Sequence, residues 1–151
     1  MDWTAPRDWN GGLLALIQRT DGKIERLAEL DFFDRCSRRA LAQAARRVDF
    51  IPVQPGTVVV GEGTPARQVL IVARGKLRVL RPGTEEAVAG KGEVFGEMAA
   101  LSHLPYSETL VAAGHAEVAV IGAREFLDLL EALPCLALKV LQRAVRPRQV
   151  A

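Results

Sequence analysis

Residues 92–112 carry the side chains and turns of this sequence that are best suited to chemistry. Val94 and Phe95 end an apolar run typical of a strand, and Gly96 permits a sharp turn just before a run of helix formers that begins at Glu97. A strand that leads straight into a helix leaves several backbone N–H groups without intrahelical partners. These groups, together with the positive end of the short helix dipole, favour an anion and above all a phosphate.

The order of residues in this stretch resembles the phosphate-binding cassette of cyclic nucleotide-binding domains, the family of bacterial catabolite-activator proteins and kinase regulatory subunits. The resemblance rests, without a gap, on Phe95, Gly96, Glu97, Met98 and Ala99, followed by Pro105, Ser107, Thr109, Val111 and Ala112. In that family, backbone amides around the Gly and the Glu hold the cyclic phosphate. The Glu accepts a hydrogen bond from the ribose 2′-hydroxyl, and an Arg after the Pro pairs with the phosphate. The resemblance implies a ligand, cAMP or another nucleotide, at Gly96 and Glu97.

Tyr106 stands where the family has the phosphate-binding Arg. Arg offers a permanent charge and a planar fork of donors, whereas Tyr offers one neutral O–H. Because hydrogen bonds to charged groups are worth about 1.5–3 kcal/mol each, we expect the affinity for cAMP to be about tenfold to a hundredfold lower than with Arg. Glu108 stands where the family has a small residue. Its carboxylate repels a phosphate if it points into the pocket, and it is a surface charge if the strand turns it outward.

The predicted ligand-binding residues are Phe95, Gly96, Glu97, Met98, Ala99, Tyr106, Ser107 and Glu108. No catalytic residue, cofactor site or metal site is predicted, because no Ser-His-Asp or Cys-His set can be placed. The two histidines, His103 and His115, have no Cys, Asp or Glu partners at ligand spacing and are interpreted as surface residues. The sequence thus predicts a binding protein and not an enzyme.

Composition places the chain among globular proteins with one core. Its 151 residues are 49% hydrophobic and 25% charged, which fits a single domain. The net charge of +2 is too small to indicate nucleic acid as a partner. Cys36 and Cys135 lack metal spacing and no secretory leader is recognised, so they are interpreted as reduced thiols of a cytoplasmic protein. The apolar run at residues 13–17 is too short to span a membrane, and no membrane partner is predicted.

From Val48 onward, short strands with period-two alternation are divided by turns that carry Gly or Pro. We expect strands at residues 48–53, 57–60, 68–73, 76–81, 86–89, 94–95, 109–112 and 117–121. Such a series predicts a sandwich or a rolled barrel, and the turns at residues 55–56, 62–63 and 75 match those of the family's β-roll. The predicted fold class is mainly β with flanking helices: an antiparallel β-roll of the double-stranded β-helix or jelly-roll type. The inward phase predicts a core of Phe50, Val58, Val60, Leu70, Val72, Leu77, Val79, Phe95, Met98, Val111, Val118 and Val120.

Helices are predicted on both sides of the roll. The first covers residues 13–19, the second begins at Lys23, and the third has Ser37 as its N-cap. Residues 26–33 resemble the helix and turn before the barrel in the family, where a Phe plugs the open side. Two more helices are predicted over residues 124–133 and 135–146, and in the family these form the lid and hinge that move with the ligand. The expected organisation is an arm with a short helix (1–22), the binding domain (23–146) and a tail (147–151).

The last predicted helix carries an apolar stripe wider than a lid over one pocket requires. Leu138, Leu141 and Val145 recur at i, i+3 and i+7, with Leu136 and Val140 on the flank. Three uses of the stripe stay open. It forms a weak homodimer through the 135–146 helix, it docks on a heterologous protein partner, or it packs on its own domain as the lid.

Two functions from different classes remain. In the first, the chain is a free-standing regulatory module that binds a cyclic nucleotide or related anionic ligand and signals by moving its C-terminal helices. In the alternative, it is a pseudo-sensor, a rigid scaffold that no longer binds nucleotide and acts as a protein interaction adaptor. Phe95, Gly96 and Glu97 favour the sensor, whereas Tyr106 and Glu108 favour the scaffold.

Overall fold

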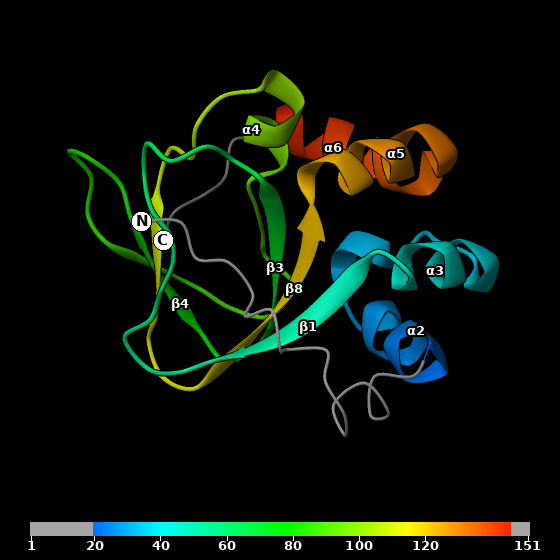
Figure 1. The fold of residues 1–151 in the computed structure, drawn as a ribbon, viewed down its shortest axis with the longest axis horizontal. Coiled ribbons are helices and arrows are strands. Elements are labelled where there is room, and N and C mark those ends of the chain that lie inside the picture. Colours follow the sequence, from blue (N-terminus) through cyan, green and yellow to red (C-terminus); the bar gives the residue numbers. More distant parts are fainter. Residues whose placement is uncertain (1–19, 146–151) are drawn as a thin grey trace.

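The computed structural model describes residues 20–145, so the predicted helix over 13–19, most of the arm and the tail lie outside the described residues. The strands form two antiparallel sheets that roll against each other (Figure 1). One sheet has the order β1 (Val48–Val53), β8 (Ala116–Gly122), β3 (Gln68–Arg74) and β6 (Val94–Phe95). The other has the order β2 (Val58–Val60), β7 (Thr109–Ala112), β4 (Leu77–Leu80) and β5 (Ala87–Ala89). The predicted antiparallel β-roll is confirmed.

Strand β3 shows why the first sheet is buried on both faces. Val69 and Ile71 belong to a core shared with the helices, whereas Leu70 and Val72 belong to the core inside the roll. All four are inaccessible to solvent. An uninterrupted apolar run therefore reflects a strand that serves two cores on alternate residues.

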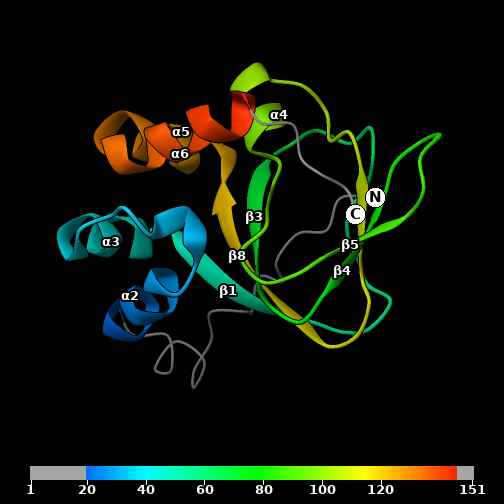
Figure 2. The same ribbon diagram turned by 180° about the vertical axis from the view of Figure 1, so that it is seen from behind.

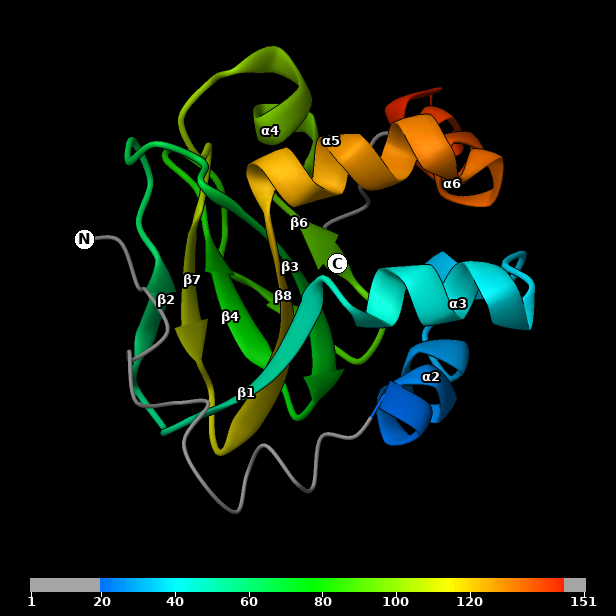
Figure 3. The same ribbon diagram turned by 45° about the vertical axis from the view of Figure 1, so that its right-hand side comes forward.

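The helices gather on the outer face of this sheet, as the two opposite views show (Figures 1 and 2). Before the roll come α2 (Thr20–Ala28), the 3₁₀ turn η1 (Asp31–Phe33) and α3 (Arg38–Ala45), and after it come α5 (Ala123–Ala132) and α6 (Pro134–Val145). The short helix α4 (Glu97–Ser102) lies at one end of the roll next to α5 (Figure 3). The predicted N-cap is confirmed, because the Ala40 N–H donates to the Ser37 hydroxyl at 3.1 Å.

Three of the predicted core residues are wrong. Val58 and Met98 are each 38% exposed, and Val111 is only partly buried. Val58 lies opposite Val111 where β2 pairs with β7, and an irregularity in that pairing turns both Val59 and Val60 inward. Met98 lies in α4, where helical geometry buries Glu97 and Ala100 instead and leaves Met98 in the wall of an open cavity. The other predicted core residues are buried.

The prediction of reduced thiols was also wrong. Cys36 and Cys135 form a disulfide whose Cα atoms lie 5.4 Å apart. The bond ties the segment before α3 to the start of α6 across 99 residues of sequence, a separation at which spacing carries no signal. The predicted cytoplasmic location was argued in part from reduced thiols, and it stays a prediction. Within residues 20–145, no helix combines the length and the apolarity needed to cross a bilayer.

Candidate functional site

A cavity of about 660 Å³ lies where β6 meets α4, between the rim of the roll and the last helix. Its wall includes every predicted site residue, from Phe95 to Ala99 and from Tyr106 to Glu108. Side chains that the sequence did not place there complete the wall: Arg81 beyond the end of β4, and Lys139 and Arg143 on α6. Phe32 of η1 is another wall residue, is 3% exposed and stacks on Phe126 with ring centroids 6.2 Å apart.

Gly96 makes the turn from β6 into α4. Its φ of 87° is a left-handed conformation that only glycine adopts without strain. A Cβ at this position would lie 2.9 Å from the Gln68 carbonyl oxygen and 3.1 Å from the Tyr106 ring. Any larger residue would therefore push the start of α4 away from the rim of the roll.

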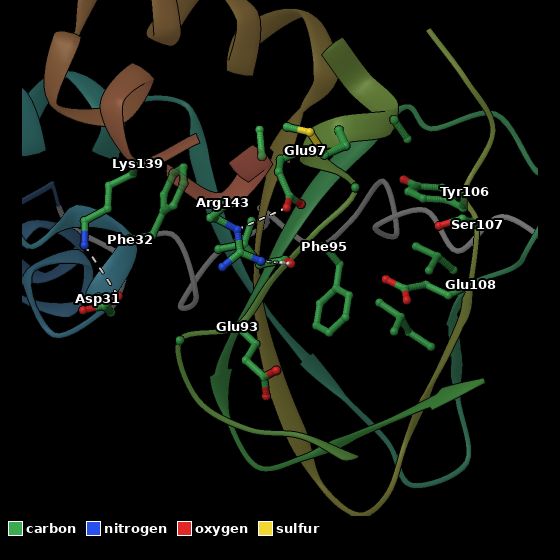
Figure 4. Close-up of a pocket in the computed structure, with 18 of the residues that line it drawn as sticks. Asp31, Phe32, Glu93, Phe95, Glu97, Tyr106, Ser107, Glu108, Lys139 and Arg143 are labelled. Carbon is green, nitrogen blue, oxygen red and sulfur yellow. Dashed lines mark hydrogen bonds and ion pairs between the residues drawn. The ribbon is translucent and has the colours of Figure 1, made fainter. Parts of the chain in front are cut away.

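Glu97 forms an ion pair with Arg143 of the last helix, α6. The Arg143 Nε donates to Glu97 Oε1 at 3.1 Å, and Arg143 Nη2 donates to the Val94 carbonyl at 3.0 Å (Figure 4). The Glu97 side chain is 5% exposed, so this ion pair is largely shielded from water. Sequence reasoning missed Arg143, because a contact across 46 residues leaves no periodic signal.

Tyr106 braces the rim of the cavity. Its hydroxyl donates to the Gln68 carbonyl at 2.7 Å and accepts from the Gln68 N–H at 3.2 Å. The residue is 6% exposed, and the chain just before it bridges Pro65 to Pro105. The hydroxyl thus satisfies both backbone groups of one residue at the start of β3.

Glu108 points into the cavity wall, which decides between the two orientations left open by the sequence. It is 8% exposed, and its Oε2 accepts from Arg81 Nε at 2.6 Å. Arg81 directly follows β4 and Glu108 directly precedes β7; the last residue pair of these strands is Leu80 with Thr109, so the two side chains lie just beyond it. Tyr106, Ser107 and Glu108, in the segment just before β7, and Leu110 within β7 all line the cavity.

Each cation that the described residues contribute to the cavity wall is paired with a carboxylate. Lys139 lies 2.8 Å from Asp34 and 3.6 Å from Asp31, and the other pairs are Arg143 with Glu97 and Arg81 with Glu108. The hydrogen bond from Lys139 holds the pKa of the Asp34 carboxyl below its usual value. An incoming anion therefore finds cations that are already neutralised by carboxylates.

A family model described as "Cyclic nucleotide-binding domain" matches residues 50–132, more than half of the chain. The chain belongs to the cyclic nucleotide-binding domain family. The matched residues cover the roll from within β1 onward, the cassette-like stretch and α5.

Curated relatives of this cyclic nucleotide-binding domain are longer proteins. Acetyltransferase Pat of Mycolicibacterium smegmatis is 28% identical over 128 residues, which cover 79% of this chain and 37% of that protein. The cAMP-dependent protein kinase regulatory subunit of Yarrowia lipolytica is 36% identical over 80 residues, 52% of this chain and 21% of that protein. The chain thus matches less than two fifths of either relative.

Solved structures show the same domain fold. A cAMP-binding acyltransferase from Mycobacterium smegmatis matches with a TM-score of 0.64 and 26% identity over 82% of this chain and 39% of that one. The Thermus thermophilus catabolite activator protein matches with a TM-score of 0.68 and 26% identity over 76% of this chain and 56% of that one. The regulatory domain of Toxoplasma gondii PKA with cAMP has a TM-score of 0.75 at 19% identity, over 88% and 52% of the two chains, and supports the fold alone.

Proposed function

We propose that this chain is a non-enzymatic regulatory module that binds a cyclic nucleotide or a related anionic ligand in the cavity and signals by moving α5 and α6. The observation that carries the proposal is the contact of Arg143 on α6 with Glu97, a predicted ligand-binding residue. A ligand that bonds to the Glu97 carboxylate competes with Arg143 for it. Occupancy of the cavity is thereby coupled to the position of the last helix.

The relatives support a small-molecule ligand. One solved relative above a quarter identity is described as a cAMP-binding acyltransferase, and a curated one as a cAMP-dependent kinase regulatory subunit. Only a part of each is matched, so acetyl transfer and kinase inhibition are not proposed for this chain. The affinity for cAMP is lower than in relatives with the cassette Arg, because the Tyr106 hydroxyl is committed to Gln68 and brings no charge.

A specific observation favours the alternative, a scaffold that binds a protein partner and no nucleotide. The cations of the cavity wall described above are all paired with carboxylates within the same protein. A ligand must compete with these pairs, whereas a scaffold keeps them as internal braces.

Calorimetry of the purified chain with cAMP, cGMP and cyclic dinucleotides separates the two functions. The proposal expects binding of at least one of these ligands, together with a change in hydrogen exchange of the α6 amides. Glu97→Gln serves as the site variant and should weaken that binding. Glu25→Gln is the matched control, because Glu25 also pairs with an Arg but lies on the surface at 68% side-chain exposure. Absence of heat with every ligand would leave the scaffold as the function.

A further inference from the structure

The cations of the cavity wall differ in how many donors their ion pairs leave unused. The Arg143 guanidinium donates through Nε to Glu97 and through Nη2 to the Val94 carbonyl. Lys139 lies between Asp31 and Asp34. Arg81 donates to Glu108 through Nε, and within the described part of the chain neither of its terminal nitrogens makes a hydrogen bond. A guanidinium has five N–H donors, so Arg81 keeps most of its capacity for another acceptor.

Arg81 also lies outside α6, the helix that moves in the proposed function. It directly follows β4, and its carbonyl oxygen accepts from the Thr84 N–H at 3.4 Å and from the Thr84 hydroxyl at 3.3 Å. The Glu108 carboxylate then sets the orientation of the guanidinium from the neighbouring strand. A group anchored at the end of a strand holds its geometry more closely than a group on an element that moves.

Tyr106 cannot supply the missing charge, because its hydroxyl is neutral and bonded to Gln68 on both sides. We infer that Arg81, held by Glu108, is the residue that contacts the anionic group of the ligand and so determines which ligands the cavity accepts. The inference rests on the proposed function. It places the cationic contact just after β4 and not at position 106, where the family has its Arg. The terminal N–H groups donate to two oxygens of the anion while Nε stays on Glu108.

The Glu108 carboxylate has two opposite effects on the contact between Arg81 and an anion. It orients the guanidinium, but its own negative charge lowers the affinity for an anion beside it. Glu108→Gln keeps an oxygen that accepts from Arg81 Nε and removes the charge. We therefore expect that variant to bind cAMP several times more tightly than the wild type.

The test compares Glu108→Gln with the double variant Arg81→Leu, Glu108→Gln, using cAMP and cGMP as probes in calorimetry. The double variant removes the guanidinium without leaving the buried Glu108 carboxylate deprived of this cation, so the comparison survives if Arg81→Leu alone does not fold. We expect it to bind about tenfold to a hundredfold more weakly than Glu108→Gln, the loss that corresponds to charge-assisted hydrogen bonds. Equal affinity of the two variants would overturn the inference.

Arg78→Leu is the matched control, because Arg78 lies on β4, the strand that Arg81 follows. It removes the same charge from β4, but Arg78 pairs with Glu86 and is not part of the cavity wall. Its affinity for cAMP should stay within about twofold of the wild type, because surface charges at a distance are screened. A loss as large as that caused by removing Arg81 would show a general charge effect and would contradict the assignment.

Adenosine provides a neutral probe that shares the base and the ribose of cAMP. If Arg81 contacts the anionic group, its removal leaves adenosine binding unchanged, and an equal loss for adenosine and cAMP overturns the inference. If no probe binds the wild type or any variant, the proposed function itself fails. Binding that does not depend on Arg81 refutes only the placement of the contact.

Discussion

The Tyr106 hydroxyl bonds both the carbonyl and the N–H of Gln68, at 2.7 Å and 3.2 Å, and so joins the loop after α4 to the start of β3. The same ring lies against Gly96, where an added Cβ would come within 3.1 Å of it. One side chain therefore holds the turn into α4 and the loop that follows α4 in a fixed relation. The position that carries the ligand's charge partner in the family is a structural brace in this chain.

Tyr106→Phe removes both hydrogen bonds and keeps the ring. We expect a loss of about 1–2 kcal/mol in the free energy of unfolding, because the partly buried backbone groups of Gln68 lose the Tyr106 hydroxyl. Tyr106→Arg should lose similar stability yet bind cAMP more tightly, since it restores the charged fork. Denaturant unfolding and calorimetry measure the two effects. If Tyr106→Arg gains no affinity, the phosphate does not lie beside this position.

The ion pair of Arg143 with Glu97 should contribute measurably to stability. Arg143→Gln leaves the Glu97 carboxylate, 5% exposed, without this cation, and we expect a loss of about 1–3 kcal/mol in urea denaturation. Arg38→Gln is the control, because it breaks an ion pair on the surface. The Arg38 and Glu25 side chains of that pair are 66% and 68% exposed. That surface pair should contribute about 0–1 kcal/mol. Equal losses in the two variants would show that α6 is not held by this contact.

The disulfide between Cys36 and Cys135 should be a major source of stability. It closes a long loop, and such crosslinks contribute about 2–4 kcal/mol, chiefly by restricting the unfolded chain. Cys135→Ser should lower the midpoint of denaturation, and a reducing agent should lower that of the wild type to the same degree. The reducing agent should leave Cys135→Ser unaffected. A wild type that does not respond to reduction would contradict a structural role for the bond.

The contact between Lys139 and Asp34 predicts a loss of stability in acid. The hydrogen bond from Lys139 is the main cause of the lowered pKa of Asp34, and Asp31 and Arg35 lower it further against a smaller desolvation effect. Because the folded pKa lies below the unfolded one, the contribution is present above about pH 4 and is lost as the pH falls through the folded value. Thermal unfolding from neutral pH to below the folded pKa measures it. Lys139→Met should reduce the fall in melting temperature at acid pH. An unchanged fall in this variant would show that other carboxylates cause it.

The exposed stripe on α6 keeps the proposal of a weak homodimer open. Leu138, Leu141 and Val145 are 41%, 63% and 74% exposed, whereas Leu136 and Val140 are buried. We expect sedimentation at rising concentration to show self-association that Leu141→Glu abolishes without lowering the melting temperature. Val88→Glu is a control on an exposed apolar residue of β5. A strict monomer at all concentrations would remove the homodimer and leave a heterologous partner for this face.

Local patterns predicted most of the fold and one part of the cavity wall, the turn from β6 into α4. Alternation predicted the strands, Ser37 predicted the start of α3, and the Phe95-Gly96-Glu97 turn predicted where the cavity lies. These features depend on near neighbours in the chain, because side-chain alternation and the φ of a glycine are local properties. The errors at Val58 and Val111 come from an irregular pairing of β2 with β7, strands that meet only after folding, which shifts the phase of the alternation.

The tertiary structure alone decided which side chains from distant parts of the sequence surround that turn. Arg143 meets Glu97 across 46 residues, Arg81 meets Glu108 across 27, and Cys36 meets Cys135 across 99. No periodicity connects such positions; they meet because the roll brings β4 beside β7 and the disulfide holds α6 against the first helices. The sequence by itself therefore determined the family, the fold and the place of the cavity. The charge partners of that place were decided by strands and helices that approach each other only after folding.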